Sequence, residues 1–506
     1  MRPFLFVILL LNWAAHLLAQ SPQLFTVSET GARSARLNVV FLSEGYAAAD
    51  LPKFAGHVQA VVNFLFAREP WLPYRSYCNV YRIEIASNQS GCDNGDASGP
   101  GGLRDTYFST GFNNPGVVQL LTLSGSGSSR AFTLLNQLVP EYDVPIVLVN
   151  DTKYGGSGGP LAVASVNVSS AAIVEHELGH SFAGLADEYD LQFAGFNPTE
   201  MPNTTAQTDR NLIRWKHWIA AATPVPTPEM AANDAVVGLF EGSMYRTNGW
   251  YRPHNNSLMR NLNRPVGAVN REQFILNYYR RISVVDGYAP ATNSRPVTGP
   301  EQLTFAVNPK KPVTTEGVAV DWWVDGVIQE GVAGTNWVVS SALLGNGAHT
   351  VTARVRDLTA YVRADPTKLL EDSVTWSFSL SGQAPDSLAA WREAYGPDDA
   401  APAGDGVANL LKYALGLDPA VAATREELPR FEWQGEFAAL RVTRQSRRAD
   451  VEYLVQFSSD LVTWTSGAPD SVTVEDSPTV LLVREATSSG AAGRRFLRLQ
   501  VRPVAN

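Results

Sequence analysis

Two histidines and a glutamate near the middle of the chain have the spacing of a metal site. His176 and His180 enclose the segment His176-Glu177-Leu178-Gly179-His180, which places both imidazoles on one face of a helix, one turn apart, within reach of a single Zn²⁺. Glu177 could take a proton from a water that zinc polarises and pass it to a leaving amine. The segment therefore predicts a catalytic zinc site, and a surface helix with two solvated histidines is the alternative.

A catalytic zinc needs a third protein ligand and an open position for water. In the metzincin pattern a glycine breaks the helix and a histidine ligand follows three residues later. Gly184 and Asp187 have this separation, although Gly184 lies four residues after His180 instead of three and an aspartate replaces the histidine. Asp187 is the expected third ligand and Glu188 the runner-up, and the carboxylate that is not a ligand would accept a hydrogen bond from a ligand N–H.

The segment after residue 240 offers side chains for two further roles. Tyr245, Tyr251 and Arg252 are candidates to stabilise an oxyanion, since a phenol or a guanidinium can be aimed at developing charge. We name Tyr251 for this role, with a packing aromatic as the alternative. Met259 is either the floor of a turn beneath the zinc histidines, as in metzincins, or an ordinary core methionine.

The elements that must position these residues alternate between strand and helix. Apolar runs and apolar spacing predict strands at 35–42, 80–85 and 144–149 and helices at 47–66 and 130–138. A strand at 161–168 directly precedes the zinc helix, which is predicted over 171–183. We expect that strand to form a sheet edge on which an extended peptide can pair, and an interior strand is the alternative.

The segment from His176 to Tyr189 resembles the active-site signature of the secreted bacterial IgA-peptidase family of zinc metallopeptidases. Further stretches resemble the same family, at Val40–Tyr46, Ser87–Gly91, Asp105–Phe108, Tyr154–Gly156, Ile213–Lys216, Tyr251–Pro253 and Ser257–Arg260. Together they span about residues 27–285. The resemblance implies a zincin-like, metzincin-like α/β domain that acts as a metal-dependent endopeptidase on proteins or peptides, with zinc on the two histidines and Glu177 as the base. It does not identify the substrate.

The 506 residues are enough for several domains. Beyond residue 285 the sequence turns rich in Pro, Gly, Ser and Asn, and it then alternates as β structure does. The predicted architecture is multidomain, an α/β catalytic domain followed by an all-β immunoglobulin-like domain and a C-terminal β-sandwich. Its parts are a signal peptide at 1–19, the metallopeptidase domain at 24–285, a linker at 286–300, the immunoglobulin-like domain at 301–381, a short helical aspartate/glycine module at 384–420 and a β domain at 421–506.

The N-terminal apolar run, with Arg2 before it and small residues near Ala19, predicts a secretory signal peptide. We therefore expect a bacterial protein that is secreted, periplasmic or held at the cell surface, with no membrane-spanning segment. In an oxidising compartment Cys78 and Cys92 would favour a disulfide, and two unpaired core thiols are the alternative. In the aspartate/glycine module we interpret Asp405 as a helix N-cap, with calcium binding less favoured.

The formal net charge of −9 and the absence of a basic stripe argue against nucleic acid and anionic membranes as partners. A non-catalytic surface protein that keeps a metal for stability is a competing function, and Glu177 argues against it because a structural site needs no base. The C-terminal modules could instead bind glycans or cell surfaces through exposed aromatic side chains around Trp322, Trp323 or Trp464.

Overall fold

The computed structural model describes residues 21–94, 102–112, 117–193, 195–292, 295–298, 301–313, 317–341, 344–381, 387–488 and 494–504. The predicted signal peptide at 1–19 lies outside these residues. The chain divides into two compact units. The first holds the chain up to Asp286 together with Pro309–Ala319 and Val355–Asp372, and the second holds Gly287–Asn308, Val320–Arg354 and the residues from Ser373 onward.

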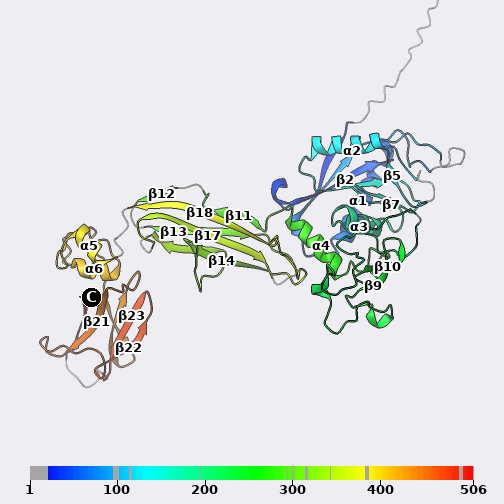
Figure 1. Cartoon of the computed structure of the whole chain (residues 1–506). Helices are drawn as coiled ribbons and strands as arrows, with labels where there is room; N and C mark the ends of the chain where they lie inside the picture. Colours follow the sequence, from blue (N-terminus) through cyan, green and yellow to red (C-terminus); the bar gives the residue numbers. More distant parts are fainter. Residues whose placement is uncertain are drawn as a thin grey trace, which may run out of the picture. The chain divides into compact units, whose positions relative to one another are not determined.

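A six-stranded sheet forms the centre of the first unit (Figure 1). Its strands lie in the order β1 (Gln23–Ser28), β3 (Cys78–Glu84), β2 (Leu37–Glu44), β6 (Val144–Val149), β8 (Ala162–Ser165) and β7 (Gly156–Ser157). The four inner strands are parallel, whereas the outer two are antiparallel to their neighbours. Every residue of β2 and β6 is buried, which is why both strands contain apolar runs, Val39–Leu42 in β2 and the whole of β6.

Three helices cover the two faces of this sheet. Helix α2 (Gly125–Leu138) packs its apolar side on one face, and α1 (Leu51–Leu65) and α3 (Ser170–Ser181) lie on the other (Figure 1). The strands and helices predicted for this region are confirmed, with some differences in their ends. Helix α2 begins five residues earlier than the predicted 130–138, because the Ser124 side chain caps it by accepting a hydrogen bond from the Gly127 N–H.

The expectation that strand 161–168 forms a sheet edge is wrong. Strand β8 pairs with β6 on one side and with β7 on the other. The glycine-rich segment before it folds back and supplies β7 as the edge strand. The outer side of β7 is itself engaged, since Gly156 donates to the Gln119 carbonyl and accepts from the Leu121 N–H.

The remainder of the first unit is built from small elements that border α3. They are the two-stranded pair β4 (Thr110–Gly111) and β5 (Thr122–Leu123), the hairpin β9 (Phe240–Ser243) and β10 (Arg246–Arg252), and helix α4 (Ala268–Tyr279). The hairpin and α4 are absent from the sequence predictions. Helix α4 buries polar residues such as Asn270 and Glu272 together with apolar ones, and this removes the regular apolar spacing that marks a helix.

Further β-sheets follow after residue 284. One contains β11 (Val285–Ala289), β13 (Gln302–Pro309) and β16 (Asn336–Ser340), and the other contains β12 (Arg295–Thr298), β18 (Glu371–Ser381), β17 (Gly347–Asp357), β14 (Val318–Val324) and β15 (Val327–Ile328). Strands β11 and β12 lie within the predicted linker at 286–300. The protein is thus multidomain, as expected, with an α/β part and several β-sheets. Within the described residues, no helix has the length and apolar character that crossing a membrane requires.

The C-terminal region contains two short helices and two sheets. The helices are α5 (Leu388–Tyr395) and α6 (Asn409–Leu415), and the strands are β19 (Arg430–Gln434), β20 (Phe437–Thr443), β23 (Val480–Glu485) and β22 (Ser471–Asp476) in one sheet and β21 (Val451–Ser458) and β24 (Phe496–Pro503) in the other.

Asp405 is not the N-cap that we expected. Helix α6 begins at Asn409, with Ala408 as its N-cap. The Asp405 carboxylate instead lies 2.8 Å from the buried ammonium of Lys412, which also donates to the Val421 carbonyl at 2.6 Å. A lysine therefore supplies the positive charge beside Asp405, where a calcium loop would hold a metal ion.

The expected disulfide is also wrong, since Cys78 and Cys92 are both free and buried. Cys78 is the first residue of β3, whereas Cys92 lies beyond the other end of that strand. A seven-residue strand spans roughly 20 Å, far more than the Cα separation of about 4.4–6.8 Å that a disulfide requires. Their spacing in the sequence could not show that a whole strand separates them.

Candidate metal centre

Helix α3 carries both histidines and ends where a glycine can turn the chain back. The Gly184 N–H donates to the His180 carbonyl and the Leu185 N–H to the Gly179 carbonyl. Gly184 adopts φ +66°, a left-handed conformation that glycine accepts without steric cost. This turn returns the following segment beneath the helix and brings Asp187 to the histidines.

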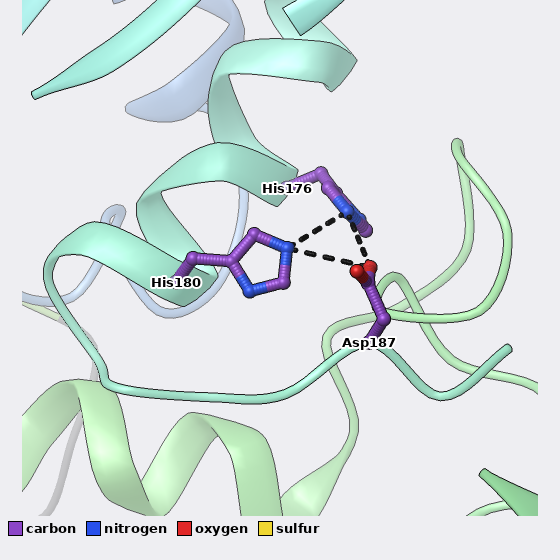
Figure 2. A group of neighbouring side chains, drawn as sticks. All are labelled: His176, His180 and Asp187. Carbon is purple, nitrogen blue, oxygen red and sulfur yellow. Dashed lines mark hydrogen bonds and ion pairs between the residues drawn. The ribbon is translucent and has the colours of Figure 1, made fainter. Parts of the chain in front are cut away.

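The side chains of His176, His180 and Asp187 converge on one point (Figure 2). The two Nε2 atoms lie 3.2 Å apart, and Asp187 Oδ1 lies 3.1 Å from Nε2 of His176 and 3.3 Å from Nε2 of His180. One ligand atom from each residue lies within 4.8 Å of the others, and within the described residues this is the one such group of His, Cys, Asp and Glu side chains. The structure thus brings together the three residues predicted as metal ligands.

The tautomers of the histidines direct unshared electron pairs at this point. His176 Nδ1 lies 3.1 Å from the Leu258 carbonyl and His180 Nδ1 lies 2.8 Å from the Leu185 carbonyl. A carbonyl only accepts, so each Nδ1 carries the proton of the neutral ring, in which each Nε2 is then a bare acceptor. Asp187 Oδ1 is buried without a hydrogen-bond donor among the described residues. Three acceptors facing one another require a cation between them, and two imidazoles with one carboxylate suit zinc.

The Asp187 carboxylate also favours the protonated form of His180. Burial by itself lowers the pKa of His180, but the hydrogen bond and negative charge of Asp187 outweigh burial and raise the pKa to about 9. A metal ion at this point would therefore have to compete with a proton for the same position.

Glu177 is nearly buried, with 8% of its surface exposed. Burial raises the pKa of its carboxyl, and the nearby His176 and His180 oppose this effect. The carboxylate faces the edge strand β7, since a Cβ added to Gly156 would lie 2.9 Å from Glu177 Oε1. A Cβ on Gly158 would likewise meet the ring of His180, 3.0 Å from Cδ2. These two glycines allow the backbone to pass directly beside the base and one histidine.

Tyr245 and Tyr189 contribute phenols to the same site. Tyr245 donates to Asp187 Oδ2 at 2.6 Å, and the ring of Tyr189 stacks on that of His176 with its hydroxyl 3.4 Å from Nε2. Tyr245 stands with Met244 at the tip of the β9–β10 hairpin, and both have positive φ, 58° and 48°, as a two-residue hairpin turn requires. The Tyr245 N–H donates to the Tyr189 carbonyl, and the Met244 N–H donates to the Asp187 carbonyl. These two hydrogen bonds hold the tip of the hairpin against the segment that contains Asp187.

The other two candidates for the oxyanion role lie elsewhere in the unit. Tyr251 packs in an apolar cluster with Trp215, Trp218 and Leu239. Arg252 is fully buried, and its guanidinium binds Glu229 and the carbonyls of β9. The structure therefore does not bring Tyr251 to the metal ligands, and Tyr189 and Tyr245 are the phenols found beside them.

Glu188, the runner-up ligand, faces away from the histidines and is completely buried. Its carboxylate accepts hydrogen bonds from Ser257 at 2.6 Å, Asn270 at 2.9 Å and Asn203 at 3.0 Å. We expected the carboxylate that does not bind the metal to accept a hydrogen bond from a histidine N–H. Glu188 accepts instead from these three side chains. Glu188 thereby fixes the ligand segment to the turn that contains Leu258.

Met259 lies beneath the metal helix. Its side chain is fully buried, and a Cβ on Gly179 would lie 2.9 Å from Met259 Cε. Gly179 is thus the position at which helix α3 packs directly against Met259. The Met259 carbonyl also accepts a hydrogen bond from the Glu188 N–H, so one turn supports both the helix and the segment of the third ligand.

Sequence reasoning passed over the positions of Tyr189 and of the Glu188 partners. Tyr189 belongs to the family signature quoted above, and this was the signal that could have identified it. Asn203, Ser257 and Asn270 are scattered over 67 residues of the chain, and no spacing rule connects them.

The comparisons with known proteins agree with this geometry where they bear on it. No curated protein matches the chain. Among solved structures, three titin domains, I67–I69 in an E-to-A mutated variant, match with 11% identity and a TM-score of 0.13, covering 43% of this chain and 59% of the titin chain. The family model described as IgA Peptidase M64 matches residues 25–234, which include the metal helix and Asp187. This part of the chain, about two fifths of its length, is therefore similar to the IgA peptidase M64 family.

Proposed function

We propose that this protein is a zinc-dependent endopeptidase. The observation that supports it most strongly is the convergence of two bare Nε2 atoms and an unpaired carboxylate oxygen on one point, with a carboxyl group beside them. His176, His180 and Asp187 would hold the metal ion. The metzincin-like character of the fold belongs to this proposal and is supported by the glycine turn at Gly184 and by Met259 beneath the helix.

Each side chain at the site has a separate task in peptide hydrolysis. When bound, zinc would act as a Lewis acid that polarises the scissile carbonyl and acidifies the attacking water. Glu177 removes a proton from that water and gives it to the nitrogen of the departing amine, so that one water is added across the broken bond. Tyr245 orients Asp187 through its hydrogen bond. We assign stabilisation of the oxyanion to the Tyr189 hydroxyl, which lies 3.4 Å from His176 Nε2.

Replacement of the base separates zinc binding from turnover. Glu177→Gln should retain about one zinc per chain while kcat falls by several powers of ten, because the ligands remain and only the proton acceptor is lost. Glu175→Gln is the matched control, since Glu175 neighbours Glu177 on the helix but faces Arg68, with its pKa raised by burial to about 7. Metal analysis and peptide hydrolysis provide the two readouts. An active Glu177→Gln variant contradicts the mechanism.

The histidines test the location of the site. His176→Ala and His180→Ala should each lose both zinc and activity. A fully zinc-loaded variant of either kind would show that the metal lies elsewhere. Loss of zinc with no change in hydrolysis would instead favour the non-catalytic alternative, in which the metal serves stability.

Export of the protein, which the N-terminal apolar segment suggests, is part of the same proposal.

The alternative function of glycan binding has less support from the structure than from the sequence. Trp322 is fully buried, and guanidinium groups cover Trp323 and Trp464, at 4.5 Å from Arg354 and 4.0 Å from Arg498. The tryptophans chosen for that role are therefore not open platforms.

A further inference from the structure

Helix α4 supports the segment that carries the third metal ligand. Asn270 donates to Glu188 at 2.9 Å, directly beside Asp187. Farther along the helix, the rings of Phe274 and Tyr278 pack on Phe182 with centroids 6.0 Å and 5.4 Å apart. The position of α4 therefore determines the position of residues 182–188, and through them that of the Asp187 carboxylate.

A loop from far downstream holds the same helix. The segment 355–372 contains the end of β17, the loop that follows it and the start of β18, and it belongs to the first compact unit. The N–H groups of Arg363 and Ala364 donate to Glu272 Oε1 on α4 at 2.6 Å and 3.1 Å. The guanidinium of Arg271, also on α4, stacks on the Tyr361 ring at 4.0 Å. The loop is thus attached to the helix turn that contains Asn270.

The Glu272 carboxylate joins the loop to the rest of the unit. It is 2% exposed, and its second oxygen accepts from His217 at 2.7 Å and from Trp218 at 2.8 Å. Burial alone would raise the pKa of Glu272, but these bonds and the one from Arg363 hold it below its usual value. A carboxylate that is buried and fully hydrogen-bonded is expensive to disrupt, since each unpaired partner costs about 1–3 kcal/mol.

At the end of α4, the loop is anchored by two tyrosines. The hydroxyls of Tyr279, on α4, and Tyr74, just before β3, each donate to Asp357 Oδ2 at 2.7 Å. Both side chains are nearly or fully buried. The two bonds are alike in length, acceptor and burial, and they differ in the element that they attach to the loop.

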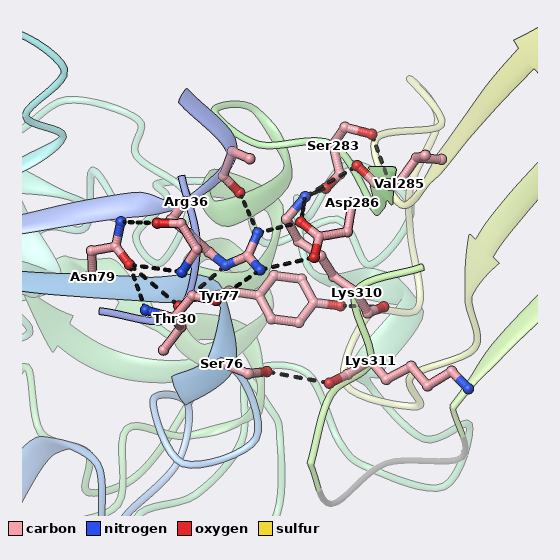
Figure 3. Close-up of polar contacts among 12 residues, drawn as sticks. Thr30, Arg36, Ser76, Tyr77, Asn79, Ser283, Val285, Asp286, Lys310 and Lys311 are labelled. Atoms are coloured by element: carbon pink, nitrogen blue, oxygen red, sulfur yellow. Dashed lines mark hydrogen bonds and ion pairs between the residues drawn. The ribbon is translucent and has the colours of Figure 1, made fainter. Parts of the chain in front are cut away.

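A second loop, which contains Lys310, also makes polar contacts within the first unit (Figure 3). Tyr77 donates to the Lys310 carbonyl at 3.0 Å, and the Lys310 ammonium lies 3.3 Å from Asp286. Arg36, which precedes β2, forms an ion pair with the same aspartate. These contacts hold Lys310 and Asp286 against the segments that lead into β2 and β3, and they do not reach His176, His180 or Asp187.

We infer that loop 355–372 is a positioning element of the metal site, and that it fixes Asp187 through Glu272, α4, Asn270 and Glu188. Glu272 and Asn270 are positioning residues and touch neither metal nor substrate. The inference rests on the proposed function, because it assumes that Asp187 is a metal ligand. It assigns a role in the site to a segment about 170 residues downstream of Asp187 and outside the part that the family model matches.

The test compares zinc affinities of full-length variants, measured by competition with a chromogenic chelator at a temperature where circular dichroism shows each one folded. Glu272→Gln should bind zinc about tenfold more weakly than the wild type. Tyr279→Phe, a milder change to the same attachment, should weaken zinc binding several-fold. Tyr74→Phe is the matched control, which should lose similar stability while its zinc affinity stays within twofold of the wild type.

A double variant locates the path. If the loop acts through Asn270, adding Glu272→Gln to Asn270→Ala should weaken zinc binding by less than the product of the two separate effects. Unchanged zinc affinity in both folded Glu272→Gln and Tyr279→Phe overturns this inference and leaves the proposed function intact. Equal weakening by Tyr74→Phe also overturns it, since general destabilisation would then be the cause. A wild type that binds no zinc overturns the proposed function and this inference together.

Discussion

Two backbone carbonyls determine the chemistry of the histidines. Leu258 and Leu185 accept from the Nδ1 atoms of His176 and His180, and this fixes both rings with their Nε2 lone pairs toward Asp187. The proposed ligand atoms are therefore oriented without a metal ion, which would reduce the conformational entropy lost when one binds. The side-chain types suggest the ligands, but the main chain determines which nitrogen of each ring faces Asp187.

Three tyrosines allow the roles at the site to be separated. Tyr245→Phe should weaken zinc binding about tenfold, since a hydrogen bond to a charged group contributes about 1.5–3 kcal/mol. Tyr189→Phe should retain zinc affinity while kcat falls about a hundredfold, as expected for loss of one oxyanion donor. Tyr251→Phe should change neither, because Tyr251 packs in a separate apolar cluster. Chelator competition and steady-state kinetics measure the two effects, and a kcat defect confined to Tyr251→Phe would restore the sequence-based assignment.

Local spacing was sufficient for some of these residues and insufficient for others. The pattern from His176 to Asp187 predicted the three residues that converge, because a helical turn and a glycine turn set their separation. It could not choose between Tyr245 and Tyr251, since both lie on one hairpin and only the tip of that hairpin reaches Asp187. Glu188 was misread because its three partners come together only through the tertiary fold.

At the scale of whole elements, the site depends on β7 and β8. The expectation of an edge at 161–168 failed because a run of apolar residues predicts a strand without revealing its neighbours. The glycines of the preceding segment allow a close backbone approach to Glu177 and His180. The helix α4 was missed because polar residues buried against the ligand segment and the loop interrupt its apolar pattern.

The pairing of β8 on both sides changes what a proline should do there. Ala164→Pro lies in a strand that is paired with β6 and with β7, so we expect loss of about 3 kcal/mol or more of unfolding free energy, often with failure to fold. Urea unfolding followed by circular dichroism measures the loss. Val168→Pro, at an exposed position beyond the strand, is the control. A stable Ala164→Pro protein with only its KM altered would return β8 to the edge.

For the molecule as a whole, the catalytic unit is not continuous in sequence. Its core is α/β and ends near Asp286, yet it also contains Pro309–Ala319 and Val355–Asp372. The sequence suggested a boundary near residue 285, because composition changes there. Composition could not show that two loops of the following β region return to the first unit, since they contact residues that are scattered along the sequence, such as Glu272 and Tyr77.

Truncation tests this organisation. A protein spanning residues 21–381 keeps both returning loops and should fold cooperatively and bind zinc as tightly as the full chain. A protein spanning residues 21–285 lacks them, leaves the Glu272 carboxylate without two of its donors, and should be unfolded or lack a cooperative thermal transition. Calorimetry and zinc titration distinguish the two proteins. Equal stability and zinc affinity in the shorter one would show that the loops are dispensable.

The most direct test of the central claim is zinc titration into chelator-stripped wild-type protein, with hydrolysis of a mixed protein substrate followed at each addition. We predict that stripping abolishes hydrolysis and that activity returns in proportion to zinc, reaching a plateau at one zinc per chain. Hydrolysis that survives complete removal of metal would contradict a metal-dependent peptidase. Full zinc loading with no hydrolysis of any substrate would leave the metal site in place and contradict its catalytic role.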